Sequence, residues 1–245
     1  MNKTYLYPYS AEEARRRNEM SLWRASHKAN LACKEEIELA IGTHFDGTHL
    51  EEGCAEGVIR EYGYKRVQWV LSHTIQQLDW SDRFSQANKE WARQTYIPKD
   101  RAHVTDLIIV SDPAIVDLFA TQFQCAYQEL GLFGPNQCEP NSFEKLDYEG
   151  KVLVLSPDTL KESYWNARAQ LWYAHDGFGC SPKAIGRSVR CTCLGDGEMT
   201  RWNRTDFIGA LKDEFLPEWA KEKLMELKGQ EQNNDSPAMG GMTMK

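Results

Sequence analysis

Three cysteines and one histidine lie close together in the stretch YAHDGFGCSPKAIGRSVRCTCLGDGEMTRWNRTD (173–206). Thiolates and a neutral imidazole are the usual ligands of structural zinc, so His175, Cys180, Cys191 and Cys193 could bind that ion together. The spacing disfavours this site, because Cys191 and Cys193 are two residues apart on a predicted strand, whereas structural zinc sites usually separate paired cysteines by two residues. We therefore expect small core residues here, no metal and no cofactor, and keep zinc as an alternative.

The same loop holds the residue types of a nucleophilic cysteine. Cys180 lies between glycines with His175 five residues earlier, and a thiol beside an imidazole can act as a nucleophile. Such partners usually come from separate elements of the fold. We therefore assign no catalytic residue, and the pair stays as the enzyme alternative. The sequence contains neither a phosphate-binding loop nor a dinucleotide fingerprint.

Two further groups of residues suit binding rather than catalysis. The first lies on one predicted helix and consists of Arg15, Arg16, Arg17, Trp23, Arg24 and Lys28. Three successive arginines oppose the dipole at the N-terminal end of a helix, so a solvated face and a contact for an acidic partner are both open. The second group surrounds a predicted hairpin and consists of Arg187, Arg190, Arg201, Trp202 and Arg204. Arginine and tryptophan are common anchors of binding surfaces.

Hydrophobic periodicity predicts that the first half of the chain is helical. Helices are expected over residues 10–42, 48–63, 64–78, 82–95 and 112–131. Serine or threonine followed three residues later by glutamate marks the starts at Ser10 and Thr48. The pair Asp112–Pro113 marks the start of the last helix. The apolar run 107–110 fits a buried strand or a helix end equally well.

The second half of the chain has a different pattern. Glycine, proline and asparagine cluster over 132–150, which is typical of a linker. Period-two alternation then predicts strands, including a hairpin whose turn is Gly195–Asp196–Gly197. The expected fold class is therefore α+β, with a helical N-terminal domain and a small α+β domain with a β-hairpin. The expected divisions are a helical domain at 1–131, a linker at 132–150, the small domain at 151–228 and a disordered tail at 229–245.

Composition limits the classes of function. The 245 residues carry a net charge of −7, and 41% hydrophobic with 27% charged residues is typical of a folded protein. An acidic chain is not a default binder of nucleic acid, because phosphate contacts need lysine and arginine. No apolar run approaches the roughly 18 residues of a membrane span, and the N-terminus lacks a signal peptide. The seven scattered cysteines suit free thiols, so we expect a cytoplasmic protein with no membrane contact.

Several segments resemble uncharacterised proteins. The N-terminal segments YPYSAEEARRRNEMSLWRASHKANLACKEEIE, YGYKRVQWVLSHTIQ and RFSQANKEWA resemble a family of domains of unknown function of the DUF3849 type. The later segments GFGCSP, GR, LGDGE and RWNRTDFIG are similar to a small module that recurs in the same setting, the plasmids, integrative elements and phages of gut bacteria. Such a family has no established activity, so the resemblance implies a context and no catalytic residue.

These observations predict a binding protein rather than an enzyme. The expected partner is a protein, or a nucleoprotein complex, contacted by the Arg15–Lys28 face and by the arginine–tryptophan hairpin. The resemblance implies an accessory protein of a mobile element, and such proteins often serve transfer, plasmid maintenance or evasion of host defence. An acidic chain without an evident catalytic site fits evasion by binding, such as inhibition of a host enzyme that acts on nucleic acid. The alternatives are an enzyme or metal-binding protein that uses Cys180 and His175, and a structural or self-assembling protein of unspecified oligomeric state.

Overall fold

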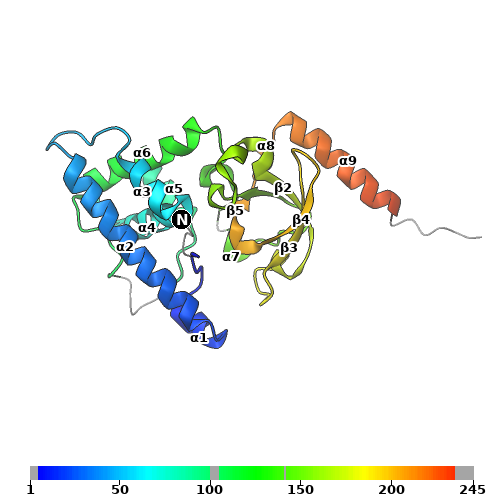
Figure 1. Cartoon of the computed structure of the whole chain (residues 1–245), viewed down its shortest axis with the longest axis horizontal. Coiled ribbons are helices and arrows are strands. Elements are labelled where there is room, and N and C mark those ends of the chain that lie inside the picture. Colours follow the sequence, from blue (N-terminus) through cyan, green and yellow to red (C-terminus); the bar gives the residue numbers. More distant parts are fainter. Residues whose placement is uncertain (1–4, 100–104, 141, 235–245) are drawn as a thin grey trace, which may run out of the picture.

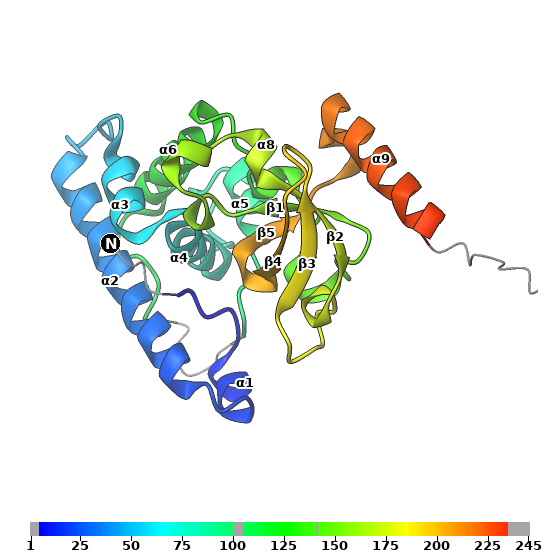
Figure 2. The same cartoon turned by 45° about the vertical axis from the view of Figure 1, so that its right-hand side comes forward.

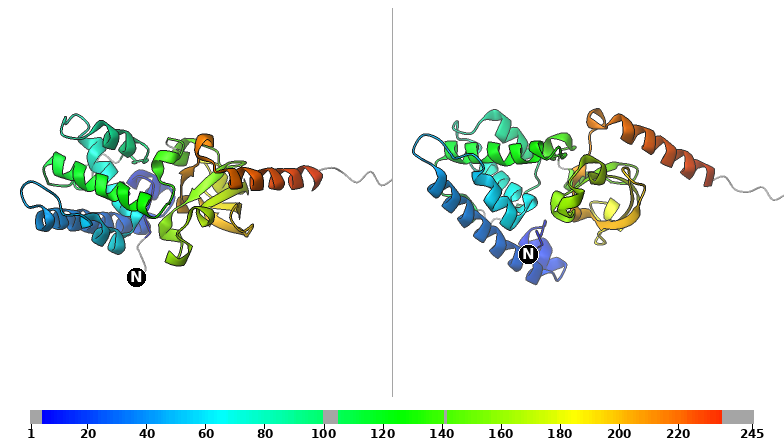
Figure 3. Two further views of the ribbon diagram at one scale, coloured as in Figure 1. Left: turned by 90° about the horizontal axis from the view of Figure 1, so that it is seen from above. Right: turned by 45° about the horizontal axis from the view of Figure 1, so that its top comes forward.

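The computed structural model describes residues 5–99, 105–140 and 142–234 and contains a helical part and a part built on a β-sheet (Figure 1). The helical part comes first in the chain, which confirms the predicted α+β class. The two parts lie side by side, and α9 (Glu218–Asn234) leads away from the sheet in both views of Figure 3. No helix within the described ranges combines the length and the apolar character that crossing a membrane requires.

The helical part is organised around α4. It contains α1 (Ala11–Arg16), α2 (Met20–His44), α3 (Cys54–Tyr62), α4 (Tyr64–Gln77), α5 (Gln86–Arg93) and α6 (Pro113–Glu129). Residues 66–75 of α4 are all buried, because α2, α3, α5 and α6 each pack against this helix. The sequence predicted α4 and α6 closely, since Asp112 caps α6 through a hydrogen bond from the backbone N–H of Ala114 at 2.9 Å.

The predicted helix over 10–42 is two helices, so that expectation is wrong. Asn18 has a φ of 58°, in the left-handed region that asparagine tolerates better than most residues. The N–H of Asn18 donates to the carbonyl of Arg15, and the N–H of Glu19 donates to the carbonyl of Ala14 at 2.8 Å. This pair of hydrogen bonds is a Schellman motif, which ends α1. Arg15 and Arg16 therefore lie in the last turn of α1, where the helix dipole favours positive charge.

The helix predicted over 48–63 is α3, and it begins six residues later than predicted, at Cys54. Thr48 caps nothing, because Asp46 Oδ1 accepts hydrogen bonds from the backbone N–H groups of Thr48 and His49 at 2.7 Å each and holds a loop. Glu51 pairs with His44 rather than returning to the helix start. The apolar run 107–110 is likewise neither strand nor helix end, although Leu107 and Ile109 are buried.

The sheet is antiparallel throughout, with strand order β4-β3-β2-β1-β5. Its strands are β1 (Val152–Leu155), β2 (Leu171–Asp176), β3 (Ser188–Cys193), β4 (Met199–Asn203) and β5 (Phe207–Ala210). The β3–β4 pair is the predicted hairpin, with Ser188 opposite Asn203. Both faces of the sheet are covered. One bears the core of Leu153, Trp172, Ala174, Val189, Cys191 and Cys193, and the other packs Val152, Val154, Leu171 and Tyr173 against the start of α9.

Residues 132–150, predicted to be a linker, are bound to the sheet. The side-chain amide of Gln170 exchanges two hydrogen bonds with the backbone of Phe133, at 2.8 and 2.9 Å. The N–H of Glu139 donates to the carbonyl of Ala210 at 2.8 Å, at the edge beside β5. Helix α7 (Ser142–Lys145) follows in the same segment. In the segment predicted to be a disordered tail, residues 229–234 continue α9, and residues 235–245 lie outside the described residues.

One carboxylate joins the two parts of the molecule at the start of α4. The helix begins at Gly63, whose φ of 86° suits glycine and whose missing side chain provides no cap. Asp158, 94 residues later in the chain, accepts from the backbone N–H of Tyr64 at 2.9 Å and from that of Lys65 at 2.8 Å. A Cβ at Gly63 would lie 2.7 Å from Asp158 Oδ1, so glycine is what allows this approach. The sheet part therefore caps the central helix of the helical part.

Removal of this cap should destabilise the whole molecule. We expect Asp158→Ala to lower the free energy of unfolding by about 1–2 kcal/mol, the usual loss for an N-cap carboxylate. The measurement is urea unfolding followed by circular dichroism. Asp213→Ala is the matched control, because Asp213 is exposed and its side chain caps no helix. Equal stability of the two variants would contradict the role given to Asp158.

Candidate functional site

The cysteine and histidine side chains predicted as a possible site do not come together. Cys180, Cys191 and Cys193 lie in the core on one face of the sheet. His175 lies on the other face, where its ring contacts Tyr173 at 4.9 Å and its Nε2 is 2.7 Å from Thr192 Oγ1. Nowhere in the described residues do three histidine, cysteine or acidic side chains meet in a way that could hold a metal ion. The structure therefore does not bring His175 to the cysteines.

Burial also disfavours the thiolate form of these three cysteines. Desolvation, the main cause, raises the pKa of Cys180 and Cys193 to about 11 and that of Cys191 to about 12. The thiolate is the nucleophilic form of cysteine, so burial disfavours nucleophilic attack by these thiols at neutral pH. They fill the core as small apolar side chains.

Arg204 belongs to the core rather than to a contact surface. It is 3% exposed, and its guanidinium lies 3.7 Å from the centre of the Tyr148 ring. It donates hydrogen bonds of 2.6–3.1 Å to the backbone carbonyls of Ser142, Phe143, Leu146, Gly179 and Cys180. The five donors of a guanidinium suit this arrangement, which ties α7 to the loop before β3. The predicted binding role of Arg204 has no exposed group to carry it.

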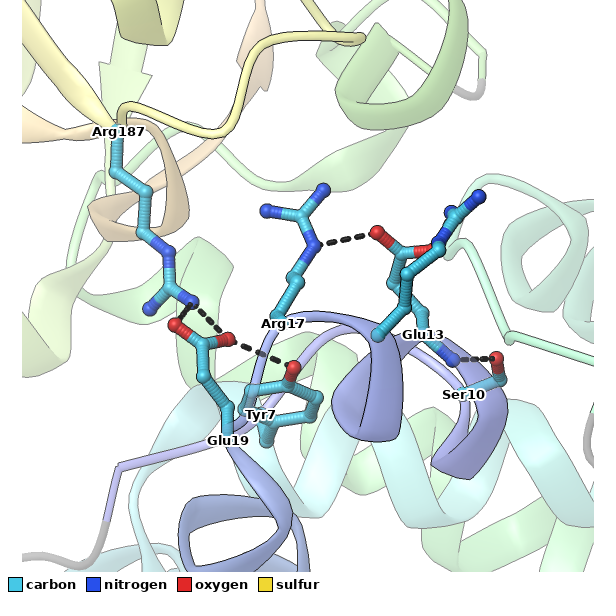
Figure 4. A network of polar contacts seen from close by, with 7 residues as sticks. Tyr7, Ser10, Glu13, Arg17, Glu19 and Arg187 are labelled. Carbon is cyan, nitrogen blue, oxygen red and sulfur yellow. Dashed lines mark hydrogen bonds and ion pairs between the residues drawn. The ribbon is translucent and has the colours of Figure 1, made fainter.

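Arg187 bridges the two parts of the molecule (Figure 4). Its Nη2 donates to Glu19 Oε1 at 2.6 Å, and Tyr7 Oη donates to Glu19 Oε2 at 2.8 Å. Arg17 lies beside this network, where its Nε donates to Glu13 and its guanidinium lies 4.2 Å from the centre of the Tyr9 ring. These two arginines fix the N-terminal segment 5–9, which runs between α2 and the sheet (Figure 2).

The other candidate residues of the hairpin differ in environment: two contact neighbouring side chains and one is exposed. Arg190 forms an ion pair with Asp176, with Nε 3.0 Å from Oδ2. Trp202 is half-buried and packs edge-on against Trp172 at 5.5 Å. Arg201 is exposed on β4. Of the predicted hairpin residues, only Arg201 is exposed.

The basic residues of α1 and α2 are more available. Arg16 is paired with Glu13 although it is exposed. Arg15, Arg24 and Lys28 are exposed, and within the part of the chain that the structure describes they form no ion pair. Arg24 and Lys28 are four residues apart, so they lie on one side of α2.

Trp23 has a different role from its basic neighbours. It is half-buried and stacks on His27, with ring centres 4.9 Å apart and planes at 7°. On α4, Trp69 stacks on His73 in the same way, at 5.4 Å and 13°. Both pairs have the spacing i, i+4, which places the two rings one above the other on a helix.

These two stacked pairs line one cavity of about 360 Å³. Tyr7 and Tyr9 of the N-terminal segment complete its aromatic walls. Sequence reasoning missed this site, although the repeated W-x-x-x-H spacing of Trp23–His27 and Trp69–His73 is visible in the sequence. A smaller cavity of about 80 Å³ lies on the sheet side, and Trp69 lines both cavities.

Comparison with known families assigns the helical part to a protein family. The sequence model of a family described as Protein of unknown function (DUF3849) matches residues 6–128, about half of the chain. The chain belongs to the DUF3849 family. The matched DUF3849 region holds both stacked pairs and the basic residues of α1 and α2, whereas the sheet and Arg187 lie beyond it. No curated protein and no solved structure matches the chain.

The contrasting positions of Arg204 and Arg201 give a direct test. We expect Arg204→Ala to lower the free energy of unfolding by about 3 kcal/mol or more, since buried carbonyls then lose their donors. Arg201→Ala, three residues earlier and exposed, should change it by less than about 0.5 kcal/mol. Thermal unfolding of both variants measures the difference. A neutral Arg204→Ala would show that the carbonyl contacts add nothing to stability.

His73 should make stability depend on pH. Burial, its largest cause, lowers the pKa of His73 from 6.5 to about 4, against a smaller opposing effect of the Leu107 backbone. As pH falls from 6.5 to 4, the unfolded chain takes up a proton that the folded chain does not, so stability falls by up to about 3 kcal/mol. His73→Phe should flatten this part of the profile, measured as the difference in unfolding free energy between the wild type and the variant at pH 7 and 4.5. Parallel profiles would contradict the assignment.

Proposed function

We propose that this protein acts by binding a protein partner through the basic surface of α1 and α2, defined by Arg15, Arg24 and Lys28. The observation that carries the proposal is that these three cations are exposed and have no ion pair among the described residues. Two of the other candidate arginines are used inside the fold, because Arg204 donates to backbone carbonyls and Arg187 pairs with Glu19. An acidic patch on a partner would complement the unpaired surface.

A protein partner fits this surface better than nucleic acid does. The whole chain carries a net charge of −7, which opposes approach to a phosphate backbone. Leu39 is 61% exposed and lies about three turns along α2 from Lys28, on the same side of the helix. An exposed apolar side chain on a basic helix face suits a protein contact, where burial of apolar surface contributes affinity.

The finer role that we propose is inhibition of a host defence enzyme that acts on nucleic acid. Support for it comes only from the resemblance of the sequence to accessory proteins of mobile elements, which is an association rather than a mechanism. A cytoplasmic setting belongs to the same proposal. A protein inhibitor of such an enzyme needs an exposed contact surface and no catalytic group of its own.

Charge reversal tests the surface. The triple variant Arg15→Glu, Arg24→Glu, Lys28→Glu should lose the partner captured by the tagged wild-type protein from host lysate treated with nuclease. The matched control is Lys145→Glu, Lys161→Glu, Lys183→Glu, which makes the same change of charge at exposed positions of the sheet part. Arg17 is left unchanged because its contacts with Glu13 and Tyr9 hold the fold.

The outcomes distinguish a protein partner from nucleic acid and from self-assembly. A partner retained by the wild type and by the control triple, and lost by the α1–α2 triple, supports the proposal. Loss of the partner after nuclease treatment would indicate nucleic acid instead. Capture of the same proteins by all three variants would contradict the surface assignment, and recovery of the chain with only itself would favour a self-assembling protein.

A further inference from the structure

We propose that the aromatic cavity between α2, α4 and the N-terminal segment binds a planar nitrogen heterocycle of the nucleobase type. This site is separate from the basic surface, so its failure and the failure of the macromolecular contact are distinguishable. The cavity holds about 360 Å³, within the range of small-molecule sites. The stacked pairs Trp23–His27 and Trp69–His73 face it from two helices.

The walls favour a flat ligand. Indole and imidazole rings present π-faces on which a heteroaromatic ring stacks, and each base stacked on an aromatic side chain contributes about 1–3 kcal/mol. Tyr7 and Tyr9 add two more rings to the lining. Tyr7 is held in place by hydrogen bonds of its backbone N–H to Ser26 Oγ at 2.9 Å and of its hydroxyl to Glu19. The aromatic lining is therefore pre-formed.

One unpaired nitrogen in the lining gives the cavity a hydrogen-bonding requirement. His73 is 3% exposed and lines only this cavity, yet its Nδ1 has no hydrogen-bond partner. Trp69 Nε1 also lacks a partner, but Trp69 lines both cavities, so this atom is not assigned to the larger one. A buried polar atom left unpaired costs about 1–3 kcal/mol, so a ligand that pairs with it gains that amount. Ser26 Oγ, Asn30 Oδ1 and Gln76 Nε2 already form hydrogen bonds within the protein.

The charges of the described lining favour a neutral or anionic ligand over a cation. The described lining contains no acidic side chain, and its one formal charge is the exposed Lys99. An aromatic cage for a quaternary ammonium group would gain from a carboxylate, which is lacking in this lining. His73 is neutral at pH 7 because burial holds its pKa near 4. A neutral heterocycle with ring donors and acceptors, and any anionic substituent directed to Lys99, matches this set.

The small cavity behind Trp69 has a simpler explanation. It holds about 80 Å³, enough for a few water molecules. Gln68 Oε1 and Gln94 Oε1, which lack protein partners, line it and are suitable acceptors for such water. The unpaired Nδ1 of His73 is not among the groups of that cavity, so water there leaves the requirement of the larger cavity unchanged.

The test uses the full chain and the four nucleosides adenosine, guanosine, cytidine and uridine. Trp23 and Trp69 line the cavity, so a stacked base should quench tryptophan fluorescence in a saturable way. His73→Phe keeps a ring on Trp69 and removes Nδ1, and we expect at least tenfold weaker binding. Trp23→Leu, at a half-buried position, should weaken binding to a similar extent. His49→Phe, at an exposed histidine outside the cavity, is the matched control.

Saturable binding of at least one nucleoside, weakened by both cavity variants and unchanged in His49→Phe, supports the site. Thermal unfolding of each variant shows that the fold is kept, and Trp23→Leu serves the purpose if His73→Phe does not fold. No saturable binding of any of the four nucleosides up to millimolar concentration would overturn the proposal. Binding that is equal in the wild type and in both cavity variants would also overturn it.

Discussion

The carboxylate of Asp158 at the start of α4 is the contact on which the rest of the structure depends. A helix begins with backbone N–H groups that have no partner inside the helix, and Gly63 supplies none from its own side chain. Because the cap comes from the segment after β1, the first N–H groups of α4 gain this partner only when the sheet part is in place. Asp158 therefore couples the fold of the helical part to the position of the sheet.

The N-terminal segment makes a second connection with consequences for the cavities. The backbone N–H of Tyr7 donates to Ser26 of α2. The hydroxyl of Tyr7 donates to Glu19, which also accepts from Arg187 of the sheet part. The segment thus forms a wall between the larger cavity and the sheet. Since α4 supplies Trp69 and His73 to the opposite wall, the same two connections that join the halves of the molecule also shape the aromatic cavity.

Local signals in the sequence predicted the elements that depend on neighbours in the chain. Asp112–Pro113 gave the start of α6, and alternation gave β3 and its hairpin partner, because these features need only adjacent residues. The break at Asn18 was missed because its left-handed conformation competes with a continuous helical pattern. Asp158 could not be predicted as a cap, because its partners lie 94 residues away in the chain. The burial of Arg204 could not be predicted either, because its carbonyl partners lie 24 to 62 residues away in the chain.

The candidate site shows the same division between residue type and position. Cysteine, histidine and arginine suggested chemistry by type, yet pleating puts His175 on the face opposite the cysteines. The paired Trp–His spacing is local and readable, but its meaning depends on α2 and α4 facing each other. Both the cavity and the basic surface lie within the DUF3849 region, whereas the sheet contributes the cap and the Arg187 bridge. If the proposals hold, the helical part binds and the sheet part keeps its helices in the binding arrangement.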